Sequence, residues 1–409
     1  MVILAVVYMF NFVDRQILAI LLPAIREEFG VSDAVLGLLS GTAFALFYVT
    51  LGIPIALLAD RWNRRNLIAI SLAVWSGMTA LSGFAANIWH LALARIGVGI
   101  GEAGCSPAAH SMISDYYPPE QRSTAMGFYT LGISAGIMLA YLAGGWVVQN
   151  IGWREAFFIV GVPGILLALV VRATIAEPVR GASEQGADTG DHPPLLDVVR
   201  FLLSRRSYLH MAFAAGLCSF VGYAVIVFFP SFIDRTYQMQ IVAIGFWLGL
   251  ILGIAGGAGF FAGGALFDFF GRRAKRRALW FIATTQLVSA IVYLGVYLAP
   301  TPYWSLMLFI IPVVISNFYL APVLAQAQSL APLRMRGVSS AITLFIINVI
   351  GLGLGSLVVG ALSDVLAPRF GDDSLRIALM STTLVILPWA ATHYFLAARS
   401  IDADLESKL

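Results

Sequence analysis

The sequence predicts an all-α integral membrane protein, with twelve membrane-spanning helices in two pseudo-symmetric six-helix bundles. Three observations lead to this prediction: 59% of the 409 residues are apolar, only 11% are charged, and long apolar runs recur along the chain. A soluble domain carries about 25% charged residues because its surface faces water. The low charge therefore excludes an ordinary cytosolic enzyme and a disordered chain, and we expect no nucleic-acid partner.

Apolar runs of about 20 residues, the length that crosses a bilayer core of about 30 Å, recur from one end of the chain to the other. They cover residues 2–22, 36–58, 67–86, 88–113, 125–148, 156–171, 209–232, 241–267, 278–298, 304–330, 338–362 and 375–396. The sixth run is short, and the break after the third is weak. Eleven or thirteen spans therefore remain as alternatives, but twelve fits best.

The longest polar interval lies near the middle of the chain and is rich in Gly, Asp, Ser and Pro, which is the composition of a linker. It predicts an N-terminal six-helix bundle at 1–178, a cytoplasmic linker at 179–206, a C-terminal six-helix bundle at 207–398 and a cytoplasmic tail at 399–409. With both termini in the cytoplasm, eighteen Lys and Arg residues fall in inner loops and the tail, against five in outer loops. This positive-inside bias predicts a multi-pass protein of the cell (inner) membrane.

A short charged motif follows the second span and recurs after the eighth, so the two halves are predicted to be parallel repeats. A second, weaker echo follows the fourth and tenth spans. The motif residues are Asp60, Arg61, Arg64 and Arg65, then Asp268, Arg272 and Arg273, with the echo at Arg122 and Arg336. We interpret them as a conformational latch at the inner face, built from charge-assisted bonds between helix ends. The alternative is that they are topology signals only.

Four ionisable residues lie inside predicted spans: Asp14 and Arg15 in the first, and Arg95 and Glu102 in the fourth. A charge at the bilayer centre costs about 2.5–3.5 kcal/mol on insertion scales, so each needs a reason. We predict Asp14 as the principal proton site, with Arg15 as its modulator and Glu102 as a second candidate. Arg95 is expected to pair with Glu102 or with substrate. The alternative is a permanent ion-pair network that only joins the two helices.

The repeated motif resembles motif A of the major facilitator superfamily, and further motifs strengthen the resemblance. These are Arg95-x-x-x-Gly99, Gly152-Trp153-Arg154 and Glu177-Pro178. The N-terminal half is similar to the spinster family of sphingolipid and lysolipid transporters. The segments that carry this similarity are Asn11-Phe-Val-Asp14-Arg15, Asp60-Arg-Trp-Asn-Arg64-Arg65 and Arg95-Ile-Gly-Val-Gly-Ile-Gly-Glu102-Ala103. The resemblance implies export of an amphipathic lipid by rocking of two six-helix halves.

In this superfamily the first, fourth, seventh and tenth helices line a central cavity, which adds candidates for substrate contact in the C-terminal half. The whole predicted substrate-binding set is Arg95, Glu102, Ser219, Tyr223, Asn317, Tyr319 and Asn348. Each uncharged member could instead form a hydrogen bond between helices. Charge in one half and uncharged surface in the other suit an amphipathic solute better than a sugar.

The predicted function is secondary active transport of an amphipathic, anionic lipid-like solute of lysolipid or sphingolipid type, by proton-coupled alternating access. The alternative is proton-coupled transport of a small organic anion or drug. A third class, an intramembrane enzyme or receptor, would need a catalytic or metal constellation, and the five His and two Cys show no such spacing. We expect no enzyme activity, cofactor or metal. We expect a monomer in the bilayer, with protons and a small amphipathic substrate as partners.

Overall fold

The computed structural model describes residues 1–179, 194–271 and 274–406, and at residues 53, 56, 57, 59, 60, 119, 120, 123 and 333 it describes the backbone alone. Part of the predicted linker at 179–206 therefore lies outside the described residues. So do Arg272 and Arg273 of the predicted latch, together with the Asp60 side chain. The described residues form helices, turns and loops, without a strand among them, and the all-α prediction is confirmed.

The chain divides into two compact units by its internal contacts. The first comprises Met1–Thr189 and Val227–Gly253, and the second comprises Gly190–Ile226 and Ile254–Leu409. Val227–Gly253 belongs to the first unit because α11 (Ile241–Leu250) packs along α7 (Pro119–Asn150) there. The two bundles predicted from the sequence, at 1–178 and 207–398, have different boundaries from these two units. They remain a prediction about the two repeats.

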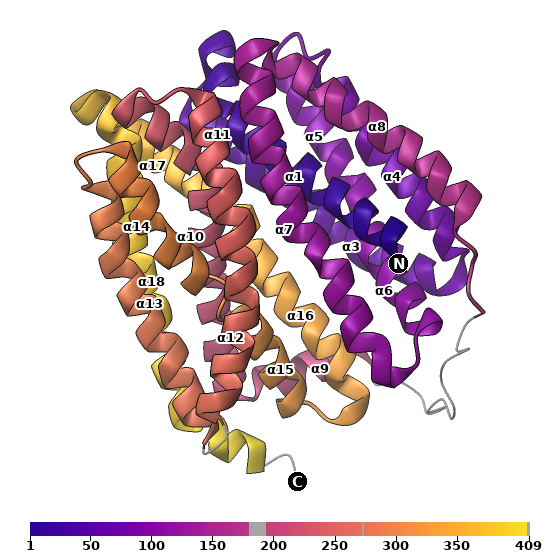
Figure 1. Cartoon of the computed structure of the whole chain (residues 1–409). Coiled ribbons are helices and arrows are strands. Elements are labelled where there is room, and N and C mark those ends of the chain that lie inside the picture. The colour runs from indigo at the N-terminus through magenta and orange to yellow at the C-terminus, as the bar shows by residue number, and fades with distance from the viewer. Residues whose placement is uncertain (180–193, 272–273, 407–409) are drawn as a thin grey trace. The chain divides into compact units, whose positions relative to one another are not determined.

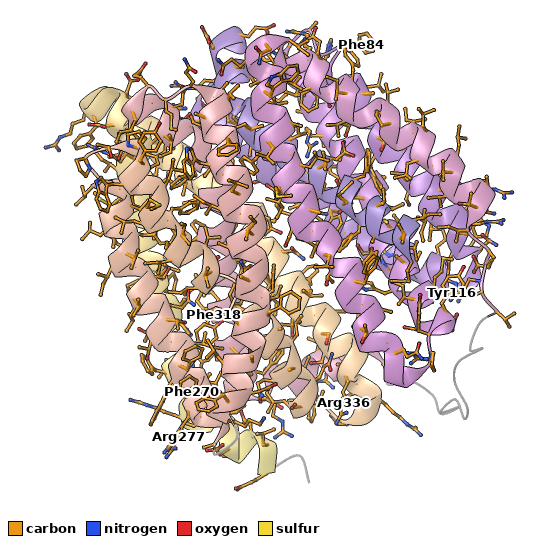
Figure 2. All side chains as sticks on the ribbon, viewed as in Figure 1. Phe84, Tyr116, Phe270, Arg277, Phe318 and Arg336 are labelled. Carbon is orange, nitrogen blue, oxygen red and sulfur yellow. The ribbon has the colours of Figure 1, made fainter. Side chains whose placement is uncertain are left out.

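The first unit is built mainly from long helices. Two of its helical stretches are interrupted, one by a π-helix at residues 38–42 and one by a break at residues 103–104. Besides α7 and α11, its elements are α1 (Val2–Phe29), α2 (Asp33–Gly37), the π-helix η1 (Leu38–Thr42), α3 (Ala43–Arg61), α4 (Arg64–Ser82), α5 (Ile88–Glu102), α6 (Cys105–Tyr116) and α8 (Trp153–Thr174). Single-turn π-helices often occur at functional sites, because the extra residue rotates the side chains that follow. Figure 2 places Phe84 and Tyr116 at opposite ends of this unit.

The second unit is also built mainly from long helices. One of them, α10 (Arg206–Tyr237), begins in this unit and ends in the first. Its other elements are α9 (Leu195–Leu203), η2 (Ile251–Ala255), which begins in the first unit, α12 (Gly256–Gly271), α13 (Lys275–Tyr297), α14 (Pro302–Ile315), α15 (Leu320–Leu330), η3 (Leu333–Met335), α16 (Arg336–Asn348), η4 (Val349–Leu354), α17 (Gly355–Phe370), η5 (Gly371–Asp373) and α18 (Ser374–Glu406).

Each of the twelve predicted spans coincides mainly with one helix or a run of consecutive helices, although the third and the ninth extend past the ends of α4 and α13, at Ser82 and Tyr297. By length and composition, nine helical stretches of the described chain could cross a membrane, and one of them, Arg336–Glu406, contains the last two predicted spans. The third and fourth predicted spans are not among the nine. The third, α4, begins with two arginines, and the fourth is divided into α5 and α6, of 15 and 12 residues.

The first unit places α1 against α7 with very little space between the two backbones. The helices run side by side (Figure 1). A Cβ atom at Gly132 would lie 2.6 Å from the carbonyl oxygen of Ala5, and one at Gly136 would lie 2.4 Å from that of Met9. Glycine is therefore required at both crossings, which fix the position of α1 and of the charged residues that follow Met9.

The core of the second unit lies where α10, α13, α15 and α18 meet, and aromatic rings extend it along α12 and α13. Phe281 stacks on Phe270 at 4.7 Å and on Phe318 at 5.9 Å between ring centroids. Figure 2 shows Phe318, Phe270 and Arg277 in succession toward the end of this unit at which Arg336 also lies. Two arginines of the predicted inner loops thus share one end of the unit.

Candidate transport site

Asp14 of α1 is completely buried, and one of its carboxylate oxygens accepts a hydrogen bond from an indole. Its side chain is 0% exposed, and Oδ2 accepts a hydrogen bond of 2.9 Å from the indole Nε1–H of Trp75 in α4, which is also 0% exposed. Oδ1 is buried and has no hydrogen-bond partner within the described part of the chain. A buried carboxylate that lacks partners is expensive in its charged form.

Arg15, the next residue, turns toward α5 and pairs with Glu102. Its Nε and Nη2 atoms donate to Oε2 of Glu102 at 3.1 and 2.6 Å, and Glu102 is 1% exposed. The second oxygen, Oε1, is buried without a hydrogen-bond partner among the described residues. Each of the two carboxylates of the site therefore has one oxygen with no partner at hydrogen-bond distance in the part of the chain that the structure describes.

Aromatic rings surround the Arg15 guanidinium on the faces that Glu102 leaves open. Its central carbon lies 4.9 Å from the ring centroids of Phe44 and Tyr48 in α3, and 5.3 Å from that of Phe12. The π-helix η1 immediately precedes the turn that carries Phe44. Cation–π contact stabilises a guanidinium where water is excluded, so Arg15 can keep its charge in this apolar surrounding.

Arg95 supplies the second guanidinium of the site, and unlike the half-buried Arg15 it is only 1% exposed. Its Nη1 donates to the backbone carbonyl of Asp14 at 3.2 Å, and its Nε is buried without a partner in the described structure. Glu102 accepts its hydrogen bonds from Arg15, whereas the hydrogen bond from Arg95 goes to the backbone of α1. With all four groups ionised the site has a net charge of zero.

The structure therefore brings together the four predicted residues of the first and fourth spans. Sequence reasoning missed Trp75, Phe44 and Tyr48. A signal for Trp75 was present, because Ser71, Trp75 and Thr79 recur at intervals of four residues along α4. That interval places the three side chains on one helix face, and Trp75 on this face bonds to Asp14 of α1.

The candidates in the second unit carry no charge and are largely engaged in helix contacts. Asn317 donates to the carbonyls of Gly256 and Val313 at 3.3 and 3.1 Å. Ser219 and Tyr319 are buried, and a Cβ atom at Gly351 would collide with the Ser219 hydroxyl. The remaining two, Tyr223 in α10 and Asn348 at the end of α16, are half-buried.

Arg64 is the centre of a bonded cluster at the end of the first unit where Tyr116 lies. It donates to Oε1 of Glu177 at 2.9 Å, to Oγ of Ser111 at 2.8 Å and to Oδ2 of Asp115 at 2.5 Å. The backbone N–H of Arg65 donates to the other oxygen of Glu177 at 2.8 Å. This cluster ties the start of α4 to α6 and to the segment after α8, and the sequence predicted neither Ser111 nor Asp115.

Glu177 is a carboxylate of this cluster that lies beyond the end of α8. Burial raises the pKa of Glu177, but hydrogen bonds from the Arg65 backbone and the Arg64 guanidinium outweigh burial and hold the pKa below its ordinary value. The ionised form is therefore the one that the cluster stabilises.

The other described latch candidates make fewer contacts. Arg122 donates from Nε to the carbonyls of Ser114 and Tyr117 at 3.1 and 3.2 Å, closing the turn between α6 and α7. Arg61, Asp268 and Arg336 are exposed. Their role in a latch stays a prediction.

Asp33, at the start of α2, is buried at the opposite end of the first unit and was not predicted as a site residue. Arg235 of α10 binds both of its carboxylate oxygens at 2.5 and 2.7 Å, and Nε of Arg26 lies 3.4 Å from Oδ1. A cavity of about 740 Å³ lies beside this cluster, and Arg26, Glu27, Asp234 and Arg235 are among its lining residues.

The helical fold, its apolar stretches and an enclosed charge cluster define a multi-pass membrane protein of the transporter type. The family model described as Major Facilitator Superfamily matches residues 4–356, and the chain belongs to this superfamily. Over 407 residues it is 31% identical to an MFS-type efflux pump of Mycolicibacterium smegmatis, covering 98% of this chain and 93% of that protein. It is thus an MFS transporter, and the predicted superfamily is confirmed.

Spinster proteins are also similar to the chain. Protein spinster homolog 1 of Xenopus tropicalis is 30% identical over 246 residues, which cover 58% of this chain and 46% of that protein. The chain thus matches about half the length of these spinster relatives.

Solved structures show the same fold along almost the whole chain. A bacterial homologue of the human lysosomal transporter spinster, in an inward-facing and unoccupied conformation, has a TM-score of 0.89 and 31% identity, covering 98% of this chain and 97% of that one. A D-xylose–proton symporter, with a TM-score of 0.73 and 14% identity over 95% of this chain and 96% of its own, shares the fold alone. The predicted major facilitator fold and the relation to spinster are both confirmed.

Proposed function

We propose that this chain is a proton-coupled secondary transporter that exports an amphipathic, anionic lipid-like solute of lysolipid or sphingolipid type. The observation that carries the proposal is the fully buried Asp14 carboxylate, whose Oδ1 has no hydrogen-bond partner in the described chain. A proton at that oxygen would remove a charge that burial makes expensive. Such a charge within a membrane span is by default a functional group.

One proton changes the net charge of the site from zero to +1. Neutral Asp14 then no longer balances the guanidinium charges of Arg15 and Arg95, and an anionic head group could take its place. Glu102 would act as a second proton acceptor, since its Oε1 is also buried without a described partner. The site thereby links proton uptake to substrate affinity, and alternating access would use that linkage to drive transport.

The distribution of polar groups supports an amphipathic substrate. The charged residues of the candidate site lie on α1 and α5, whereas the candidates of the second unit are Ser, Tyr and Asn side chains. The relation to spinster supports a lipid-like solute, and the relative named as an efflux pump supports outward movement.

A small organic anion or drug is a second candidate substrate, and one observation favours it. The Nε of Arg95 is buried without a hydrogen-bond partner in the described part of the chain, so a compact carboxylate could occupy this position. Thermal-shift screening separates the two: stabilisation by single-chain anionic lipids but not by small carboxylates supports the first.

For the cellular setting we propose a monomer in the inner membrane, with both termini in the cytoplasm. The excess of Lys and Arg in the predicted inner loops supports this orientation. A membrane carrier of this kind needs no cofactor and catalyses no covalent chemistry, which agrees with its membership of a transporter superfamily.

Reconstitution into proteoliposomes tests the coupling. With a fluorescent anionic lysophospholipid as probe, Asp14→Asn should abolish the response to a pH gradient while movement down a concentration gradient persists. Asp372→Asn, which changes an exposed acid in the short helix η5, is the matched control. Normal proton coupling in Asp14→Asn would remove Asp14 from the mechanism.

A further inference from the structure

We propose that Trp75 is a positioning residue that directs the coupled proton to Oδ1 of Asp14. The proposal rests on the function proposed above and adds a residue to its proton site. The geometry behind it is simple: the indole N–H of Trp75 points at Oδ2 from 2.9 Å, and Oδ1 has no hydrogen-bond partner among the described residues.

The chemistry of the indole makes this contact directional. Tryptophan has one polar hydrogen and no acceptor, so Trp75 can only donate. A protonated carboxyl has one carbonyl oxygen and one hydroxyl oxygen, and a donor binds best to the carbonyl. With the indole on Oδ2, the arrangement that keeps this bond places the proton on Oδ1.

The indole has little freedom to move away from Asp14. Trp75 is fully buried, and α5 crosses it so closely that a Cβ atom at Gly101 would lie 2.6 Å from the Trp75 backbone nitrogen. The neighbouring residue on α5 is Glu102. The contact between α4 and α5 therefore fixes both Trp75, which donates to Asp14, and Glu102, which accepts from Arg15.

The groups that face Asp14 come from two further helices. Arg95 and Glu102 act on it from α5, and Thr79 acts on it together with Trp75 from α4. Arg15, on its own helix, is engaged with Glu102. The Thr79 hydroxyl faces the Asp14 carboxyl, but neither this hydroxyl nor Oδ1 has a partner within hydrogen-bond distance among the described residues. The indole N–H of Trp75 is at hydrogen-bond distance, 2.9 Å from Oδ2.

Replacing Trp75 by Phe keeps an aromatic ring and removes the donor. A hydrogen bond to a charged acceptor is stronger than one to a neutral acceptor, so the ionised carboxylate loses more than the protonated one. Proton uptake by Asp14 should then occur at higher pH, with the midpoint raised by about one unit.

Infrared difference spectroscopy of the purified full chain in lipid, titrated with acid, observes this proton without a substrate. The carbonyl band of protonated Asp14 is the one that Asp14→Asn removes. In Trp75→Phe this band should move to higher frequency, because its carbonyl loses a donor, and its titration midpoint should rise. Trp304→Phe, at an exposed tryptophan of α14, should change neither.

A tryptophan analogue with sulfur in place of the N–H, introduced at position 75, separates positioning from packing because it preserves the shape of the ring system. It should reproduce both shifts of Trp75→Phe. An unchanged band and midpoint in both variants would overturn the role of Trp75 while leaving Asp14 as the proton site. If Asp14→Asn removes no band, the proposed proton coupling itself fails.

Discussion

Asp33 and Arg235 form a two-bond ion pair in the first unit, although 202 residues separate them in the sequence. Asp33 is 2% exposed, and the two N–O distances are 2.5 and 2.7 Å. A bidentate pair of this kind is both directional and strong. α2 belongs to the predicted N-terminal bundle and α10 to the predicted C-terminal one, so rocking of the two would have to break it.

Asp33→Asn is expected to weaken the pair with Arg235. Removing one partner from a buried ion pair costs about 3–5 kcal/mol, because the other charge is left without compensation. The melting temperature in detergent should fall, and a cysteine placed at Gln238, which lines the adjoining cavity, should react faster with an impermeant thiol reagent.

Glu28→Gln is the matched control for that experiment. Glu28 pairs with Arg154 at 2.6 Å, but its side chain is 42% exposed, and exposed pairs contribute at most about 1 kcal/mol. Equal effects of the two substitutions would show that Asp33 is no more important than a surface pair.

Arg64→Lys tests the cluster that Arg64 forms with Glu177, Ser111 and Asp115. A lysine ammonium is a compact charge and cannot bond Glu177, Ser111, Asp115 and the carbonyl of Pro178 at the same time, as the guanidinium of Arg64 does. We expect a loss of about 2–4 kcal/mol in the free energy of unfolding, the range for disrupting a buried charged network.

Arg61→Lys, three residues earlier and exposed, provides the comparison. Surface substitutions of this kind change stability by about 0.5 kcal/mol or less. Thermal unfolding of both variants in the same detergent measures the difference, and a wild-type melting temperature for Arg64→Lys would contradict the prediction.

The lowered pKa of Glu177 predicts that the stability of the folded protein depends on pH. Its pKa is lower in the folded protein than its ordinary value, so its contribution is fully present above the ordinary glutamate range of about 4.3 and is lost as the pH falls through the lowered pKa. Glu177→Gln should therefore melt below the wild type at pH 7.

The gap between the two melting temperatures should close as the pH is lowered from about 5 to 3, because the wild-type carboxylate then becomes protonated. Melting curves at matched ionic strength measure it. A gap that stays constant over this range would show that the ionised form of Glu177 is not the stabilising one.

Gly136→Ala tests the crossing of α7 and α1. The added methyl would lie 2.4 Å from the carbonyl oxygen of Met9, so α1 must shift, at a cost of about 1–3 kcal/mol. Because Asp14 follows Met9 by little more than one turn, we also expect slower proton-driven transport. Gly127→Ala on the same helix, where nothing lies within 4 Å, should be close to neutral in both assays.

The sequence was sufficient to predict most of the helices and to select the four charged residues that meet in the candidate transport site. Continuous apolar runs determine where helices can cross a membrane, and a charged residue within such a run has few alternatives to facing other protein groups. Asp14, Arg15, Arg95 and Glu102 could therefore be chosen before their neighbours were known.

The pairing of those charges could not be predicted. Arg15 and Glu102 are 87 residues apart, and their contact depends on how α1 and α5 are rotated about their axes. Trp75 looks apolar in a hydropathy reading, although its indole N–H supplies the hydrogen bond to Asp14. The bond between Asp33 and Arg235 joins two helix ends whose proximity only the folded chain reveals.

The interruption between α5 and α6 has a mechanical consequence. The fourth predicted span stops being a regular helix at Ala103 and Gly104. The part before the break holds Arg95 and Glu102, and the part after it is fastened to Arg64 through Asp115. A rotation of α5 that starts at its charged residues can therefore be absorbed at this break, so α5 can turn while α6 stays bonded to Arg64.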